Sequence, residues 1–382
     1  MRGLKVSNWK GEKSHCFCIF NMPVRSPFEA DVAKAGHGEV VLRLLPPSIP
    51  TLSSLTYKYP LKLLARTPGF VPKSFTQTCP SPPVHLYLLT YGGGLLPGDH
   101  IDVSVTLEER TRMVVSTPQG STKIFKTEPT ASVKGQRGSP AHRVTDMSRQ
   151  LLNVRIGNEA ALCYLPDPAV PYRNSRYEQM QTFVIDGTAP ESERASLCVL
   201  DWVTEGRGSR GESWDFHLWK GRNEVWSDDG SGLRKLLLRD SVILDDECGH
   251  DNDLIDGQGE LPEQRNLIKE RTHPNGIVGT LILHGPVYEN LASFIIQRFT
   301  WQPRIGARNW SLTALPSKGA TESSSTISSS NVTWTAARVR AGFTLVKFGA
   351  RDFETAKSWL SDLLREEGSV VREFGEEALI CL

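Results

Sequence analysis

A glycine-rich turn followed by strictly alternating apolar and polar residues is the feature that most constrains the fold. Gly92 to Gly94 open the turn in YGGGLLPGD, and glycine allows backbone dihedrals that other residues avoid. Residues 101–108, IDVSVTLE, then alternate with a period of two, which predicts a β-strand with one buried and one exposed face. A second strand at 113–116 leads into the polar run STPQGSTK. We therefore expect Asp99, at the end of the turn, to lie near the hydroxyl-rich residues 117–123.

Period-two alternation, or a short apolar run between turn signals, recurs along the rest of the chain. Further strands are predicted at 38–45, 84–90, 151–156, 160–165, 177–185, 197–203, 214–219, 277–283, 293–300 and 337–348. The period changes to that of a helix at 353–364, with Asp352 as its N-cap and Gly368 at its end. Many short strands without strand–helix alternation indicate an all-β protein, whether sandwich, barrel or solenoid.

The composition is that of an ordinary soluble globular protein, with 39% hydrophobic and 23% charged residues. The formal net charge of +1 gives no reason to expect nucleic acid or an anionic membrane as partner. No apolar run approaches the ~20 residues that a membrane span needs. The seven cysteines are scattered and odd in number, as is typical of reduced thiols in the cytosol. We therefore predict a cytoplasmic protein.

Several stretches lack the periodicity of a folded core. Residues 1–25 are predicted to be a disordered leader or an incorrectly assigned start, because Met22 could serve as the initiator. Residues 26–382 are expected to form a single domain. Its polar or serine-rich loop insertions are predicted at about 127–150, 245–272 and 311–332.

Common enzyme motifs are absent from the sequence. The turn GGGLLPGD lacks the Gly-Lys-Ser/Thr ending of a P-loop and the spacing of a dinucleotide fingerprint. The chain contains neither a zinc-protease HExxH nor a GxSxG nucleophile elbow. Asp99 and Glu212 could form a glycosidase pair, but no sequence feature places them on the two sides of a cleft. An unrecognised hydrolase is thus the enzymatic alternative to a non-catalytic protein.

Three sequence blocks occur in an order that matches a known family. The glycine turn leads to STPQGSTKIF at 116–125, and YLPDPAVPYRNSRYEQ at 164–179 and EGRGSRGESW at 205–214 follow. These blocks resemble the GG-hydrophobic-GD turn with TTQ-x-x-TK-x-[YF], the LPxPxxPFxxSxxxQ segment and the GRxAxGE signature of the urease accessory protein UreD family, also called UreH. Weaker similarity extends from about 57 to 364. The resemblance narrows the all-β fold to a right-handed, β-helix-like stack of many short strands with a small helical C-terminal part.

The resemblance also implies a function, that of a non-catalytic scaffold in urease maturation. UreD proteins bind the urease apoprotein and UreF, through which the GTPase UreG is recruited, and conduct Ni²⁺ through an internal tunnel toward urease. No tightly bound cofactor is expected, only Ni²⁺ in transit. Oxygen groups that bind the ion weakly suit such transit, and Asp99 and Glu212 are the predicted residues of the metal path, together with Thr117, Ser121 and Thr122. A pure binding scaffold without a metal path is the alternative.

Overall fold

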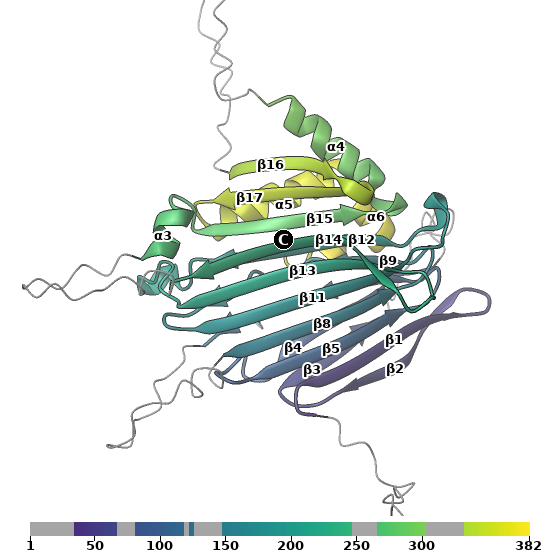
Figure 1. The fold of residues 1–382 in the computed structure, drawn as a ribbon, viewed down its shortest axis with the longest axis horizontal. Helices are drawn as coiled ribbons and strands as arrows, with labels where there is room; N and C mark the ends of the chain where they lie inside the picture. The colour runs from purple at the N-terminus through teal and green to yellow at the C-terminus, as the bar shows by residue number, and fades with distance from the viewer. Residues whose placement is uncertain (1–33, 67–80, 118–121, 126–146, 247–265, 303–331) are drawn as a thin grey trace, which may run out of the picture. The chain divides into compact units, whose positions relative to one another are not determined.

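Two β-sheets and a small group of helices make up the part of the chain that the computed structural model describes (Figure 1). The described residues are 34–66, 81–117, 122–125, 147–246, 266–302 and 332–382. The predicted leader at 1–25 lies outside them, as do most residues of the three predicted insertions. Among the described residues, no helix combines the length and the apolar character needed to cross a membrane.

The first sheet has seven strands in the order β14–β13–β11–β8–β5–β1–β2. Neighbouring strands from β1 through β5, β8 and β11 to β13 are parallel, whereas β2 and β14 pair antiparallel at the two edges. The strands are β1 (His37–Leu45), β2 (Ile49–Tyr57), β5 (His100–Leu107), β8 (Ser148–Ile156), β11 (Arg176–Asp186), β13 (Leu218–Asp228) and β14 (Arg234–Asp245).

The second sheet has eight strands in the order β16–β17–β15–β12–β9–β6–β4–β3. Its central strands β4, β6, β9 and β12 are parallel. The strands are β3 (Leu61–Arg66), β4 (Val84–Thr90), β6 (Arg112–Ser116), β9 (Ala161–Tyr164), β12 (Ser196–Thr204), β15 (Ile277–His284), β16 (Val332–Val339) and β17 (Phe343–Ala350). Two short strands, β7 (Lys123–Ile124) and β10 (Val170–Pro171), pair with each other in the connections.

The chain passes from one sheet to the other at each successive long strand between β4 and β13. Strands β4, β6, β9 and β12 belong to the second sheet, and β5, β8, β11 and β13, which follow them in turn, belong to the first. Each round therefore adds one parallel strand to each sheet. This arrangement confirms the predicted all-β, β-helix-like stack.

Inward-facing residues of both sheets form the main apolar core, for example Ile101 of β5 and Leu197 of β12. A second core lies on the other face of the second sheet, where Leu281 packs with Leu291 and Leu360 of the helices. Figure 1 shows α5 and α6 behind the strands β15 and β17. The helices are α3 (Leu267–Thr272), α4 (Glu289–Thr300), α5 (Phe353–Glu367) and α6 (Ser369–Phe374).

The predicted C-terminal helix is confirmed, and its ends follow local capping rules. The side chain of Asp352 accepts a hydrogen bond from the backbone nitrogen of Thr355, as an N-cap does. Gly368 ends α5 with φ of 79° and ψ of −1°, the left-handed conformation that glycine adopts without strain. The last turn extends to Glu367, three residues beyond the predicted 353–364.

Two predicted strands are wrong. Residues 293–300 belong to the helix α4, which buries Leu291, Ala292 and Ile295 on one face. The short apolar run in 293–300 fits a strand or a helix equally well. The helical spacing becomes visible only when Leu291 and Ala292, which precede the run, are included. The predicted single strand at 337–348 is instead the hairpin β16–β17, whose turn contains Ala341 with φ of 60°.

Three predicted boundaries also differ from the structure. The alternating residues 214–217 form a loop, in which Trp214 has φ of 59°, and β13 begins only at Leu218. The insertion predicted at 127–150 overlaps the start of β8 at Ser148. The insertion predicted at 245–272 includes α3, which Asn266 caps through its side chain. The ends of β13, β8 and α3 depend on contacts with elements that are distant in sequence, and local polarity does not reveal those contacts.

Candidate functional site

The connections from the second sheet to the first stack along one edge of the protein. Because β4, β6, β9 and β12 are parallel, their C-terminal ends lie on the same side. The described segments 91–99, 116–117 with 122–125, 165–175 and 205–217 follow these ends, and they contain most of the described residues of the three sequence blocks. We call these four segments the connection layer.

Backbone hydrogen bonds join neighbouring segments of the connection layer. The amide of Leu95 donates to the carbonyl of Lys123 at 2.8 Å, and the amide of Tyr172 donates to the carbonyl of Ile124 at 2.9 Å. The amide of Asn174 donates to the carbonyl of Asp215 at 3.0 Å. Blocks far apart in sequence are therefore direct neighbours in space.

Asp99 stabilises the glycine turn. Its Oδ2 accepts a hydrogen bond from the backbone nitrogen of Leu96 at 2.8 Å, and its carbonyl accepts from the amide of Arg149 at 2.8 Å. Gly98 has φ of 84°, which favours glycine. At Gly94 a Cβ atom would lie 2.6 Å from the carbonyl oxygen of Lys123, so the close approach of two connections requires glycine there.

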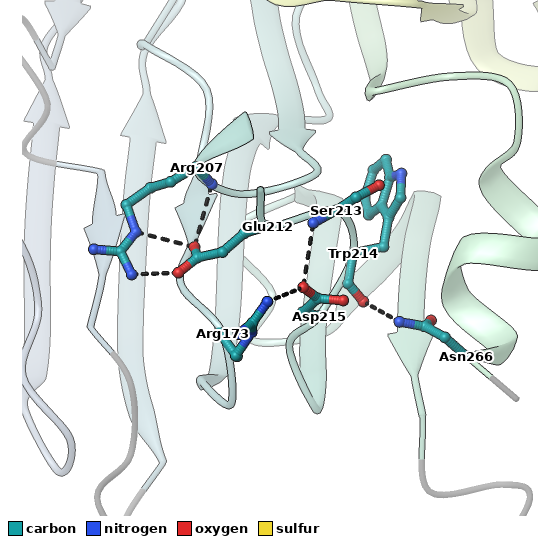
Figure 2. A network of polar contacts seen from close by, with 7 residues as sticks. All are labelled: Arg173, Arg207, Glu212, Ser213, Trp214, Asp215 and Asn266. Atoms are coloured by element: carbon teal, nitrogen blue, oxygen red, sulfur yellow. Dashed lines mark hydrogen bonds and ion pairs between the residues drawn. The ribbon is translucent and has the colours of Figure 1, made fainter. Parts of the chain in front are cut away.

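Glu212 forms a buried ion pair with Arg207 within its own connection (Figure 2). Nε of Arg207 donates to Glu212 Oε2 at 3.0 Å, and a second guanidinium nitrogen contacts Oε1. The guanidinium also stacks 3.8 Å from the ring centroid of Tyr172. The hydrogen bonds from Arg207 hold the pKa of Glu212 below its usual range. In this geometry Glu212 holds the Arg207 guanidinium against Tyr172, and Arg207 thereby joins the fourth segment of the layer to the third.

A neighbouring network holds the same loop (Figure 2). Arg173 pairs with Asp215 at 2.9 Å, and the amide of Ser213 donates to Asp215 Oδ2 at 3.4 Å. The side-chain nitrogen of Asn266 donates to the carbonyl of Trp214 at 2.9 Å. The loop after β12 is therefore tied both to the preceding connection and to the start of α3.

Of the predicted path residues, Thr117 and Thr122 line an interior cavity beneath the connection layer, whereas Asp99 and Glu212 do not. Thr117 Oγ1 accepts from the amide of Asp167 at 2.9 Å, and Thr122 Oγ1 donates to the carbonyl of Pro168 at 2.6 Å. Ser121 lies outside the described residues. Contact of Asp99 and Glu212 with Ni²⁺ stays a prediction, and its test is given in the Discussion.

The cavity lies between the two sheets and has room for a water molecule. The volume that the centre of a water molecule can occupy in this cavity is about 20 Å³, and one ordered water needs ~10–15 Å³. Polar side chains make up much of its wall: Thr117, Thr122, Gln150, Tyr164, Asp167, Tyr177, Gln179, Gln181 and Asp201.

Asp201 of β12 is the central charged group of this wall, and its residue is only 7% exposed. Its carboxylate accepts hydrogen bonds from Gln179 Nε2 at 3.1 Å and from Asn223 Nδ2 at 2.7 Å. Burial raises the pKa of the Asp201 carboxyl to about 6; the charge of Asp240 adds to the increase, whereas the two hydrogen bonds and the charge of Lys347 oppose it.

Further polar residues lie beside these groups on neighbouring strands, so that a row of them runs from the cavity to the side of the stack. In the first sheet Gln181, Asn223 and Asp240 are aligned on β11, β13 and β14. In the second sheet Asp201, Thr280 and Lys347 are aligned on β12, β15 and β17. Lys347 Nζ bridges the two sheets by contacting Asp240 Oδ1 at 2.7 Å. We call Gln179 and these six residues the interior polar row.

Some oxygen atoms of the interior polar row have no hydrogen-bond partner among the described residues. They are Gln181 Oε1, Asn223 Oδ1 and Asp240 Oδ2, all of which are buried. Within the described ranges, no cluster of three or more His, Cys, Asp or Glu side chains could hold a metal ion. The interior therefore offers water or a cation a series of weak oxygen contacts and no strong cage.

Sequence reasoning missed the interior polar row, although a signal was present. Asp201 is the one charged residue in SLCVLDWVT, a strand whose residues are all buried. Gln179 and Gln181 lie between Tyr177 and Phe183 on the inward face of β11. Polar residues at inward positions of apolar strands are costly and therefore indicate a buried network or a functional site.

The fold and the interior define the class of protein to which this chain belongs. It is a stack of two β-sheets whose connections form one layer above an interior lined with oxygen atoms. The sequence model of the family described as "UreD urease accessory protein" matches residues 35–378. The chain therefore belongs to the UreD family, and the resemblance drawn from the three sequence blocks is confirmed.

The curated relatives include proteins of fungi and plants. Urease accessory protein 4 of Cryptococcus neoformans is 31% identical over an alignment that covers 64% of this chain and 69% of its own length. The uncharacterized urease accessory protein ureD-like of Schizosaccharomyces pombe is 29% identical, covering 82% and 88%. Urease accessory protein D of Arabidopsis thaliana is 34% identical, covering 51% and 55%.

Proposed function

We propose that this UreD-family protein is a non-catalytic scaffold that binds the urease apoprotein and UreF, recruits the GTPase UreG through UreF, and conducts Ni²⁺ to the urease active site. Family membership supports the role in urease maturation. The connection layer supports a docking role, because it gathers the family-like blocks on one edge of a rigid stack.

The interior polar row is the observation that carries the Ni²⁺ path. A buried polar group without a hydrogen bond costs about 1–3 kcal/mol, and Gln181 Oε1, Asn223 Oδ1 and Asp240 Oδ2 have no partner in the described part of the chain. Apolar side chains at these positions would make a more stable core. Retention of a costly polar interior supports a role in passing a polar cargo.

The chemistry of the row suits a cation in transit. Carboxylate, amide and hydroxyl oxygens bind Ni²⁺ less tightly than thiolates or imidazoles do, so each contact can release the ion to the next. Asp201 supplies charge at the centre, and Thr117 and Thr122 supply oxygens beneath the connection layer. Gly221 lets the Trp219 ring and this carboxylate pack against β13, because a Cβ there would lie 2.5 Å from Trp219 Cη2 and 3.1 Å from Asp201 Oδ2.

A path-blocking variant separates conduction from pure scaffolding. Gln181→Met keeps the length of a side chain that is 1% exposed and removes its unpaired oxygen, so the fold should persist. Thr182→Val is the matched control, because Thr182 faces outward on the same strand. Each variant is expressed with the host urease, UreF and UreG, and the composition of the complex and the nickel content of urease are measured.

We expect the Gln181→Met complex to have normal composition and to deliver little nickel, while the control delivers nickel normally. Normal delivery by both variants would favour the alternative, a pure binding scaffold. Absence of urease and UreF from complexes of the wild-type chain would refute the scaffold itself.

A further inference from the structure

The outer end of the interior polar row carries more negative than positive charge. Asp201 and Asp240 contribute two carboxylates, and in the described part of the chain Lys347 is the one cation that influences the Asp201 carboxyl. Tyr164 and Tyr177, which also face Asp201, stay neutral because burial raises the pKa of both phenols. Among the described residues, the two buried carboxylates therefore share one lysine, and a buried carboxylate without its own partner charge is unfavourable.

Unpaired oxygens are concentrated at the same place. Asn223 donates to Asp201 with Nδ2, lies directly opposite Asp240 in the register of β13 and β14, and has its Oδ1 unpartnered. Asp240 Oδ2 also has no partner among the described residues, and the two residues are 1% and 8% exposed. Asn223 thus links the two carboxylates, since it donates to Asp201 and lies opposite Asp240, and two oxygens of this group have no donor among the described residues.

Lys347 is held loosely enough to leave. Its side chain is 46% exposed, whereas that of Asp240 is 9% exposed. Besides the 2.7 Å contact with Asp240, its ammonium makes a single weak contact of 3.5 Å with Thr280 Oγ1. A flexible four-carbon stem can turn such an ammonium into solvent without disturbing the strand.

We propose that Asp201, Asn223 and Asp240 form a divalent-cation site in which the Lys347 ammonium is a displaceable counter-ion. A divalent cation balances the two carboxylates once the lysine has turned outward, whereas the lysine balances only one. Oxygen ligands of this kind suit Mg²⁺ or Mn²⁺ and hold Ni²⁺ weakly. The site deepens the proposed Ni²⁺ path by giving it a lysine-gated end, and in that respect it rests on the proposed function.

Direct binding to the isolated full-length protein tests the site. Mn²⁺ is the probe, because thiols and imidazoles elsewhere in the chain would compete for Ni²⁺. We expect Lys347→Met to bind Mn²⁺ about tenfold more tightly than wild type and Asp240→Asn about tenfold more weakly, as for the loss of one charged contact. Lys220→Met is the matched control, since Lys220 pairs with Glu178 at 2.5 Å on the outward face.

A second readout needs no substitution. Saturating Mn²⁺ should increase the rate at which an amine-reactive reagent labels Lys347 and leave the labelling of Lys220 unchanged. Unchanged Lys347 labelling, or equal Mn²⁺ affinity of wild type, Lys347→Met and Asp240→Asn, would overturn the proposal. Neither measurement involves urease, so the site and the proposed function can fail separately.

Discussion

Replacing Asp201 by asparagine should stabilise the protein at neutral pH and destabilise it slightly in acid. The carboxylate is buried between Gln179 and Asn223, and both donate to it. Asparagine keeps the shape but has only one acceptor oxygen. A rotated Asn223 amide could accept from the new donor through Oδ1, which has no partner among the described residues.

The magnitude follows from the pKa of the Asp201 carboxyl. Burial raises this pKa from its ordinary 3.8 to about 6, and one pKa unit corresponds to about 1.36 kcal/mol, so ionisation costs roughly 3 kcal/mol above pH 7. Because the pKa is raised, the wild-type protein has its full stability from this group below pH 4, where the carboxyl is neutral. It loses about 3 kcal/mol of that stability as the pH rises through 6. Rearranged hydrogen bonds cost about 1 kcal/mol at every pH. The variant should therefore be about 1 kcal/mol less stable near pH 4 and about 2 kcal/mol more stable at pH 7.5.

Urea unfolding of wild type and Asp201→Asn between pH 4 and pH 8 measures this crossover. Asp186→Asn is a control of opposite sign, because hydrogen bonds from Thr188 lower the pKa of Asp186. A constant difference in the free energy of unfolding between wild type and Asp201→Asn across this range would refute the reasoning.

Three further predictions concern the connection layer. Asp99→Asn combined with Glu212→Gln, the predicted path residues, should leave the urease complex intact but deliver little nickel, and wild-type nickel loading would end that assignment. Gly94→Ala should lower the free energy of unfolding in urea by about 1–3 kcal/mol, because its Cβ would meet a carbonyl oxygen at 2.6 Å. Gly208→Ala is the control and should change that free energy little, because the nearest atom to its Cβ would be 3.4 Å away. Arg207→Gln should be less stable than wild type at pH 6, and the deficit should shrink below pH 4.5 in thermal melts, because the ion pair lowers the pKa of Glu212 from its ordinary 4.5 and its stabilisation is lost as the pH falls.

Local sequence rules predicted many of the strands and the C-terminal helix, but not β2 (Ile49–Tyr57) or β14 (Arg234–Asp245). β4 spans Val84–Thr90 as predicted, because turn signals bound an apolar run of strand length. α5 begins and ends at the expected caps, since Asp352 and Gly368 act on their immediate neighbours. α4 was mistaken for a strand, because periodicity does not distinguish a short apolar run in a strand from one in a helix.

The interior polar row depends on long-range register and could not be assembled from local patterns. Asp201, Asn223, Asp240 and Lys347 come from four strands, and their meeting requires both the pairing within each sheet and the packing between sheets. Alternation shows that Asn223 points inward but not which residue it meets. Glu212 was singled out from its sequence block as a residue of the metal path. In the structure it pairs with Arg207 of the same loop and does not line the interior cavity.

The nickel content of urease matured with Asp201→Asn tests the central claim most directly. Equal amounts of complex, each checked for urease and UreF, are prepared with wild type and with the variant, and nickel per urease active site is determined by mass spectrometry. The proposed path predicts that the variant, although more stable at pH 7.5, gives urease with little nickel, because the central charge of the interior polar row is gone. Urease fully loaded with nickel by the Asp201→Asn complex would contradict conduction through this interior.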